Sequence, residues 1–172
     1  HHRYLHSYPT RRSSDLHLLK HLNLPAKRLV EPFCGSCALS LAVGDRAESF
    51  WLNDLNGDLI GLLQQIRNDP KAVISRSRRY FTPEKNEEST YYRLRKKFNT
   101  INDSPLTKAA LFLYLNRHGY NGLCRYNADG GFNVPFGRYE APYFPEREIL
   151  EATEILARAE ITAKDFTEVM EA

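Results

Sequence analysis

A short stretch after the first apolar run of the chain has the residue types of a nucleotide-binding turn. Residues 31–37 read Glu-Pro-Phe-Cys-Gly-Ser-Cys and precede a stretch of helical composition. Gly35 lets the backbone turn tightly and lets a ligand approach it. Asp54 follows the next apolar run, where a carboxylate can accept two hydrogen bonds from a ribose diol. The pattern predicts a cofactor pocket, but a turn glycine and a solvated loop aspartate explain it equally well.

The spacing of Cys34 and Cys37 also suits a metal or redox site. However, no second cysteine pair and no cysteine–histidine pair at ligand spacing lies nearby in the sequence. We therefore expect small buried thiols and no metal. The three cysteines, which include Cys124, do not make the framework of a secreted disulfide domain and favour a reducing cytoplasm.

A second segment, residues 116–139, combines arginine, asparagine and tyrosine with enough glycine to bend. Arginine can pair with guanine and asparagine with adenine, and an aromatic ring can stack on bases or wedge between them. Residues 127–131 lie between aromatic stretches and predict a β-hairpin that fits a major groove. Residues 71–97, with nine Lys/Arg against three Asp/Glu, could contact phosphates. A tyrosine-rich turn in a protein core, beside a solvated basic helix face, is the alternative.

The apolar pattern predicts the elements that position these segments. Strands are expected at 28–33, 49–53 and 160–166, and helices at 17–24, 38–43, 59–68, 91–98, 107–117 and 146–159. Strand, glycine turn, helix, strand and acidic residue, in that order, form a βαβ unit of a doubly wound α/β sheet. The 172 residues suffice for one compact domain, with or without a small second lobe.

Residues 1–16 do not share this pattern, because they show neither a helical nor a strand period. Residues 6–16 resemble the translation of a sequencing-adapter oligonucleotide, so we expect a non-native segment; a basic arm that contacts DNA phosphates is the alternative. The segment carries three arginines and one aspartate, so without it the net charge falls from +3 to +1 and says little about partners. No apolar run approaches the roughly 20 residues of a membrane span, so no membrane partner is expected.

The two segments, in this order, resemble Dam-type DNA adenine N6-methyltransferases. The similarity runs from about Leu29 to Ala172 and is most specific in LFLYLNRHGYNGLCRYN, GGFNVPFGRYEAPYFPE and YYRLRKKFN. It implies methyl transfer from S-adenosylmethionine to adenine N6 in double-stranded DNA, typically within GATC. It also implies an α/β fold, a partial Rossmann-like methyltransferase domain with an inserted, mainly helical target-recognition lobe that carries a β-hairpin.

The resemblance assigns a role to individual residues. Phe33 and Gly35 match the cofactor loop, and Asp54 matches the acidic residue that binds the cofactor ribose. Asp165 matches a contact to the cofactor adenine. The remaining matches contact DNA: Arg125 reads the target guanine, Tyr120 and Asn121 hold the gap left by the flipped adenine, Leu123, Pro135 and Tyr139 contact bases, and Arg95, Asn127, Asn133 and Arg138 contact phosphates.

The chain departs from the family pattern in three respects. Cys37 stands where the family usually has a second glycine, and its side chain could crowd the methionine end of the cofactor. Neither the family's Lys-Trp-x-Gly-Gly-Lys motif nor its Asp-Pro-Pro-Tyr motif occurs in the 172 residues. The second motif holds the adenine amino group, so we expect the N-terminal part of a monomeric enzyme that ends before its catalytic motif and is inactive by itself.

The expected organisation has three parts. Residues 17–56 begin the cofactor-binding domain, residues 57–145 form the recognition lobe, and residues 146–172 return to the cofactor-binding domain. Two other functions remain open. One is a DNA-binding module without catalysis that uses only the recognition lobe. The other is a nucleotide-dependent oxidoreductase built on the βαβ unit, for which the glycine pattern is poor.

Overall fold

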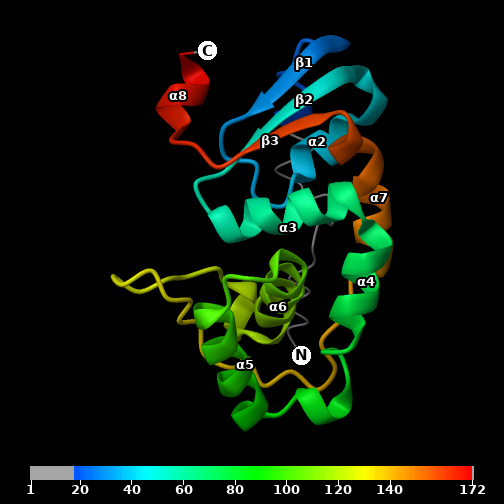
Figure 1. Ribbon diagram of the computed structural model, residues 1–172. Coiled ribbons are helices and arrows are strands. Elements are labelled where there is room, and N and C mark those ends of the chain that lie inside the picture. Colours follow the sequence, from blue (N-terminus) through cyan, green and yellow to red (C-terminus); the bar gives the residue numbers. More distant parts are fainter. Residues whose placement is uncertain (1–17, 172) are drawn as a thin grey trace.

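A parallel sheet of three strands lies at one end of the molecule, with helices packed beneath and beside it (Figure 1). The computed structural model describes residues 18–171, so residues 1–16, expected to be non-native, lie outside the described residues. The strands β1 (Ala26–Glu31), β2 (Ala47–Asn53) and β3 (Ala159–Thr162) follow the order β1-β2-β3. This mixed α/β fold is consistent with part of the expected Rossmann-like domain.

β2 is the central strand, and its apolar side chains are buried, as expected for a strand with a neighbour on each side and helices packed over it. The register places Leu29 opposite Phe50, Phe50 opposite Ala159, and Leu52 opposite Ile161. Both pairings are parallel, so the carboxyl ends of the three strands meet at one edge of the sheet.

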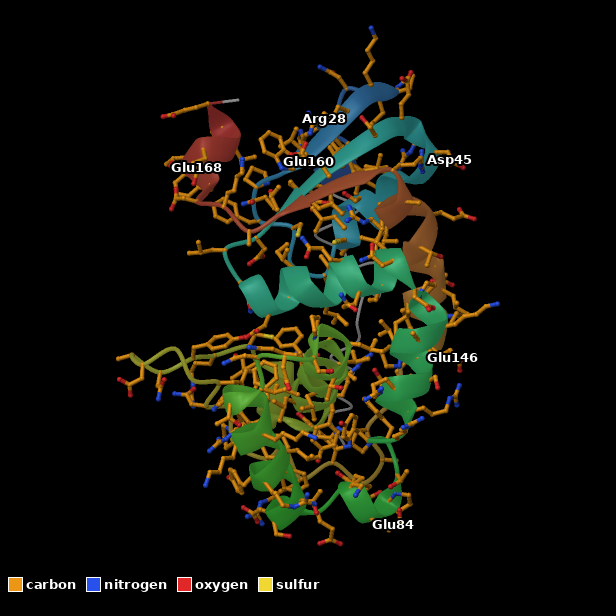
Figure 2. All side chains as sticks on the ribbon, viewed as in Figure 1. Arg28, Asp45, Glu84, Glu146, Glu160 and Glu168 are labelled. Carbon is orange, nitrogen blue, oxygen red and sulfur yellow. The ribbon has the colours of Figure 1, made fainter. Side chains whose placement is uncertain are left out.

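An ion pair bridges the two outer strands across β2. Arg28 of β1 and Glu160 of β3 lie together at the sheet (Figure 2), with 2.5 Å between nitrogen and oxygen. The Arg28 guanidinium also lies 4.9 Å from the centroid of the Trp51 ring. Both charged side chains are about half exposed, so the pair contributes little stability by itself, but it shields the indole from water.

The predicted βαβ unit is confirmed. The helix α2 (Ala38–Val43) has the expected bounds and leads through a 3-10 turn (Gly44–Arg46) to β2. β1 ends at Glu31 rather than at residue 33, because Pro32 has no N–H to donate to a neighbouring strand.

A run of helices separates β2 from β3 in the sequence. These helices are α3 (Gly57–Asn68), α4 (Pro70–Arg78), α5 (Glu88–Thr100), α6 (Pro105–His118) and α7 (Glu146–Ala157), with 3-10 turns at Pro83–Lys85 and Tyr120–Gly122. α3 lies between the sheet and α6 (Figure 1). Its Gln64 side chain donates to the carbonyl of Ile161 in β3 at 3.3 Å, so α3 is tied to the sheet as well as to the helices.

The sequence prediction has no helix at α4, which lies in the basic stretch 71–97. Two start signals explain why a helix forms. The Asp69 side chain accepts a hydrogen bond from Ala72 N at 2.9 Å, and Pro70 takes the first helical position, where no N–H is needed. The same Asp-Pro pair marks the end of α3, which is the only role that the sequence prediction gives it.

α6 is more deeply buried than predicted. Its composition suggests one apolar face, but Ala110, Leu111, Phe112, Leu113 and Leu115 are all at most 2% exposed. Consecutive buried positions mean that α6 is surrounded by other elements, with α3, α4 and α5 packed against it. Neither α6 nor any other helix within residues 18–171 is long and apolar enough to cross a membrane.

Two further predictions need correction. The strand expected at 160–166 ends at Thr162, and the chain then enters the helix α8 (Phe166–Met170). The hairpin turn at 127–131 forms, but within the described residues its arms form no regular strands, only the isolated antiparallel bridges Tyr126↔Phe132 and Gly119↔Phe136. At the other end of the described residues, the chain is helical at positions 18–19 and turns by His21, so a helix over 17–24 is seen only in part.

Candidate functional site

Asn53, the last residue of β2, joins the carboxyl ends of the three strands. Its Nδ2 donates to the carbonyls of Pro32 at 3.0 Å and Lys164 at 2.9 Å. Its Oδ1 accepts from Thr162 Oγ1 at 2.8 Å and from Lys164 N at 2.9 Å. The buried amide therefore makes all four of its possible hydrogen bonds and fixes the loops that follow each strand. Asn53 was not predicted as a site residue, although a polar residue at the end of an apolar run is a signal.

The structure brings two predicted cofactor residues together. Gly35 N donates to Asp54 Oδ2 at 3.1 Å, and Asn56 N donates to Asp54 Oδ1 at 2.9 Å. Gly35 has φ +49°, a backbone conformation that suits glycine. An ionised carboxylate has about four acceptor positions, so Asp54 keeps acceptor capacity for a ligand hydroxyl at the edge of the sheet. Open parallel sheets bind ligands at this edge.

The two cysteines of the same loop are buried. Cys37 lies at φ +58°, which explains why glycine suits this position, and it is 2% exposed. The hydrogen bond with Cys34, followed by burial, raises the pKa of the Cys37 thiol well above its ordinary value. Since the thiolate is the form that reacts and binds metals, this environment disfavours both. Among residues 18–171 no group of three or more His, Cys, Asp and Glu is placed to hold a metal ion.

An exposed aromatic pair lies beside this loop. Phe33, 70% exposed, packs its ring 5.2 Å from that of Phe166, which begins α8. Asp165 caps α8 by accepting from Thr167 Oγ1 at 2.6 Å and from Thr167 N at 2.9 Å, and these bonds, that from the hydroxyl foremost, lower the pKa of the Asp165 carboxyl. Phe33 and Asp165 are predicted cofactor residues, whereas Phe166 was missed. Exposed aromatic rings of this kind offer an apolar surface to a planar ligand.

Arg125 and Asn133, both predicted to contact DNA, hold each other across the hairpin. Arg125 Nε donates to Asn133 Oδ1 at 2.8 Å, and Arg125 Nη2 donates to the Asn133 carbonyl at 3.2 Å. Within the described residues these bonds occupy two of the five guanidinium donors. The outer edge of the guanidinium therefore remains available, in a fixed orientation, for a bidentate partner.

Two predicted phosphate contacts also support the hairpin from within. Asn127 Oδ1 accepts from Gly131 N at 2.7 Å and so closes the turn. Arg95 Nη1 donates to the Val134 carbonyl at 2.8 Å, and its guanidinium lies 4.7 Å from the centroid of the Tyr92 ring. Both side chains thus have a structural contact in the protein in addition to the predicted DNA contact.

The remaining predicted DNA contacts lie close to the hairpin. Asn121, at φ +53°, donates its N–H to the Tyr139 hydroxyl at 2.9 Å. Tyr120 is 52% exposed and also donates its N–H to the Pro135 carbonyl. The side chains of Leu123, Pro135 and Arg138 are exposed as well, and Arg138 pairs with Glu88 at 3.1 Å.

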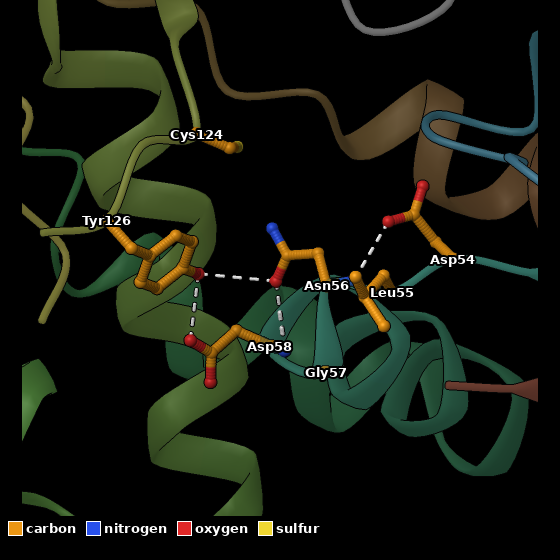
Figure 3. Close-up of a pocket in the computed structure, with 7 residues that line it drawn as sticks. All are labelled: Asp54, Leu55, Asn56, Gly57, Asp58, Cys124 and Tyr126. Carbon is orange, nitrogen blue, oxygen red and sulfur yellow. Dashed lines mark hydrogen bonds between the residues drawn. The ribbon is translucent and has the colours of Figure 1, made fainter. Parts of the chain in front are cut away.

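A cleft of about 530 Å³ lies between the turn that follows β2 and the predicted recognition hairpin (Figure 3). One wall is formed by residues 54–58, and the other by Cys124 and Tyr126. The Tyr126 hydroxyl donates to Asp58 Oδ2 at 2.8 Å and lies 3.3 Å from Asn56 Oδ1. Asp54 is the predicted site residue that lines this cleft, and Cys124 and Tyr126 are the sequence neighbours of the predicted Arg125.

Sequence comparisons find known proteins that are similar over most of the chain. Residues 17–172 match the model of the D12 class N6 adenine-specific DNA methyltransferases. The chain is 48% identical over 155 residues to the retron Ec67 DNA adenine methylase of Escherichia coli, which covers 89% of this chain and 53% of the relative. It is 46% identical over 142 residues to the DNA adenine methylase of Salmonella typhi, covering 83% and 50% respectively. The chain thus spans about half the length of the curated relatives that it matches.

Proposed function

The chain belongs to the D12 class of N6 adenine-specific DNA methyltransferases, and from this premise we propose that the protein transfers a methyl group from S-adenosylmethionine to adenine N6 in duplex DNA. One observation carries the proposal. The cleft has the carboxylate of Asp54 on one wall and the residues beside Arg125 on the other. A site that binds a nucleoside cofactor next to a base-reading hairpin is what methyl transfer to a base requires.

The residues at the sheet edge fit the cofactor. We propose that Asp54 accepts hydrogen bonds from the ribose diol and that the Gly35 turn lets the cofactor approach the backbone. Phe33 and Phe166 offer apolar surface to the adenine ring, and Asp165 lies next to them for the amino group. When bound, S-adenosylmethionine supplies the electrophilic methyl group.

The hairpin and its surroundings fit duplex DNA. We propose a GATC target in which Arg125 reads a guanine through the outer edge of its guanidinium. The target adenine must leave the helix so that its N6 reaches the methyl group, and Tyr120 with Asn121 is proposed to hold the gap. Leu123, Pro135 and Tyr139 contact bases in this proposal, and Arg95, Asn127, Asn133 and Arg138 contact phosphates.

We also propose the division into a cofactor-binding part, residues 17–56 and 146–172, and a recognition lobe, residues 57–145, within a monomeric protein. The 172 residues contain no Asp-Pro-Pro-Tyr motif to hold the amino group of a flipped adenine. The 172-residue chain by itself is therefore expected to be inactive, whereas the full-length protein is expected to methylate DNA.

The test is transfer of labelled methyl from S-adenosylmethionine to duplexes that contain GATC, or the same duplex with the adenine already methylated on both strands. We expect the full-length protein to label only the first duplex. Labelling of neither duplex, together with DNA binding, would support a binding module instead. Labelling by the 172-residue chain alone would contradict its expected inactivity.

A further inference from the structure

The hydroxyl of Tyr126 links the recognition hairpin to the turn that carries Asp54. Tyr126 follows Arg125 directly, and its ring packs edge-on against Phe132 on the other arm of the hairpin, with 5.6 Å between ring centroids. The hydroxyl leaves the hairpin and donates to Asp58 at 2.8 Å (Figure 3). The acceptor is a carboxylate, and hydrogen bonds to charged groups are stronger than those between neutral groups.

The turn that receives the Tyr126 hydroxyl also fixes Asp54, the carboxylate that is proposed to bind the ribose. Asn56 donates its N–H to Asp54 at 2.9 Å, and the Asn56 side chain caps α3 by accepting from Asp58 N at 3.1 Å and Leu59 N at 3.2 Å. The Tyr126 hydroxyl lies 3.3 Å from that same side-chain oxygen. Movement of Asp54 therefore displaces the acceptors that hold Tyr126.

A second contact makes Asp58 a junction of three elements. Lys108 of α6 places its Nζ 3.3 Å from Asp58 Oδ1, while Tyr126 uses Asp58 Oδ2. Lys108 and Asp58 are 34% and 21% exposed, so the pair is partly shielded from solvent. Asp58 is thus held by α6, and its position does not depend on the hairpin alone.

We propose that Tyr126 is a positioning residue that couples cofactor binding to DNA binding. The proposal rests on the proposed function, because Asp54 must bind the cofactor and Arg125 must read DNA. Cofactor binding orders the turn from Asp54 to Asp58, which holds Tyr126 and thereby sets the position of Arg125. The coupling must be reciprocal, so bound DNA strengthens cofactor binding by the same factor.

The experiment measures the dissociation constant for a GATC duplex with and without S-adenosylhomocysteine, the unreactive product, using the full-length protein. We expect the product to tighten DNA binding about fivefold or more, the lower range of allosteric couplings. The coupling ratio is the dissociation constant for DNA without the product divided by that with the product. In Tyr126→Phe this coupling ratio is expected to fall to about one, because the hydroxyl that links the hairpin to the turn is lost. At saturating DNA, KM for the cofactor is expected to rise while kcat changes little.

Tyr91→Phe is the matched control. It also removes one hydroxyl that supports the hairpin, because Tyr91 donates to the Val134 carbonyl at 3.0 Å, but it has no contact with the turn at Asp54. We expect the control to lower DNA affinity equally with and without the product, so its ratio stays at the parent value.

Three outcomes separate the possibilities. A coupling ratio near one in Tyr126→Phe, with the parent value kept in Tyr91→Phe, supports the coupling. An unchanged ratio in Tyr126→Phe, or a ratio of one in the parent protein that binds both ligands, overturns the coupling but leaves the proposed function intact. Failure of the parent to bind either ligand contradicts the proposed function. If Tyr126→Phe unfolds, Asp58→Ala removes the carboxylate that accepts from the Tyr126 hydroxyl, and its coupling ratio must also fall to about one.

Discussion

At the scale of single residues, Arg125 has the most direct role in the proposed reading of sequence. Asn133 fixes its guanidinium, so its outer edge can pair with guanine at little cost in side-chain entropy. We expect Arg125→Ala to reduce discrimination between GATC and a duplex changed at the guanine by about 1–3 kcal/mol. Binding titrations of the full-length protein with both duplexes test this.

Arg138→Ala is the control for Arg125→Ala. Arg138 is proposed to contact a phosphate, which carries no sequence information, and within residues 18–171 an exposed ion pair with Glu88 holds it. Loss of the Arg138 side chain should weaken binding of both duplexes alike. It should also reduce the salt dependence of the binding constant by the equivalent of about one phosphate contact. If Arg125→Ala also weakens both duplexes alike, Arg125 does not read the base.

Asp54 offers a test of the cofactor site that does not involve DNA. In Asp54→Asn one of the two oxygens becomes an amide nitrogen, which cannot accept from Gly35 N or Asn56 N. We expect affinity for S-adenosylmethionine to fall at least tenfold, in line with about 1.5–3 kcal/mol for hydrogen bonds to a charged group. Calorimetric titration measures it. Asp45→Asn should leave the affinity unchanged, because Asp45 is an exposed carboxylate in the turn before β2, at the opposite end of that strand from Asp54.

At the scale of elements, Gly137 leaves no room for a side chain where the hairpin packs on itself. A Cβ at Gly137 would lie 2.4 Å from Tyr139 Cε2 and 2.9 Å from the Gly119 carbonyl. Gly137→Ala must therefore displace Tyr139 and break its bond to Asn121. We expect lower stability in urea unfolding and weaker binding of GATC.

Gly61→Ala is a control that is expected to change the stability in the opposite direction. Gly61 lies within α3, and a Cβ there meets nothing within 4 Å. Alanine favours a helix over glycine by about 1 kcal/mol, so this variant should be more stable than the parent. Equal effects of Gly61→Ala and Gly137→Ala would contradict the packing described for the hairpin.

Local sequence rules predict the elements well but not their surroundings. The bounds of α2 and the existence of α3, α5, α6 and α7 follow from apolar spacing and turn residues. The full burial of α6 does not, because it depends on what the remote helices cover. α4 was missed for another reason: its start depends on the Asp69 cap and Pro70, which were interpreted as the end of α3.

The candidate site shows the same division. Gly35 and Asp54 can be predicted from a turn and a strand end, and the structure brings them to 3.1 Å. The roles of Phe166 and Tyr126 could not be assigned, because they arise where segments far apart in the chain meet. Asn53 had a local signal, a polar residue at a strand end, but its remote partners could not be predicted. Tyr126 lies in the hairpin that the sequence predicts, yet no neighbouring residue in the sequence indicates that its hydroxyl reaches α3.

At the scale of the whole molecule, a buried histidine makes stability depend on pH. His118 is 1% exposed, and its Nδ1 lies 3.0 Å from the Tyr114 carbonyl. Burial lowers the pKa of His118 to about 4, and the bond to the carbonyl opposes this only in part. The unfolded chain binds the proton near pH 6.5, so stability is lost as the pH falls from 6.5 towards 4, by about 3 kcal/mol.

Urea unfolding at pH 7 and at pH 4.5 measures this loss. His118→Phe keeps an aromatic ring next to Phe81 and Tyr114 but cannot bind a proton. The variant should show a smaller difference between the two pH values, even if it is less stable at pH 7. An equal difference in both proteins would mean that other groups cause the pH dependence.

The pairing of β2 with β3 has a consequence for the order of folding. Asn53 and Thr162 are hydrogen-bonded although they lie 109 positions apart, and contacts this distant in sequence form slowly because a long loop must close first. In refolding with pulsed hydrogen exchange, Gly119 N, bonded within α6, should be protected before Asp54 N, bonded to β3. A chain emerging from the ribosome is then expected to complete the helices that support the hairpin before Asp54 is held at the edge of the sheet.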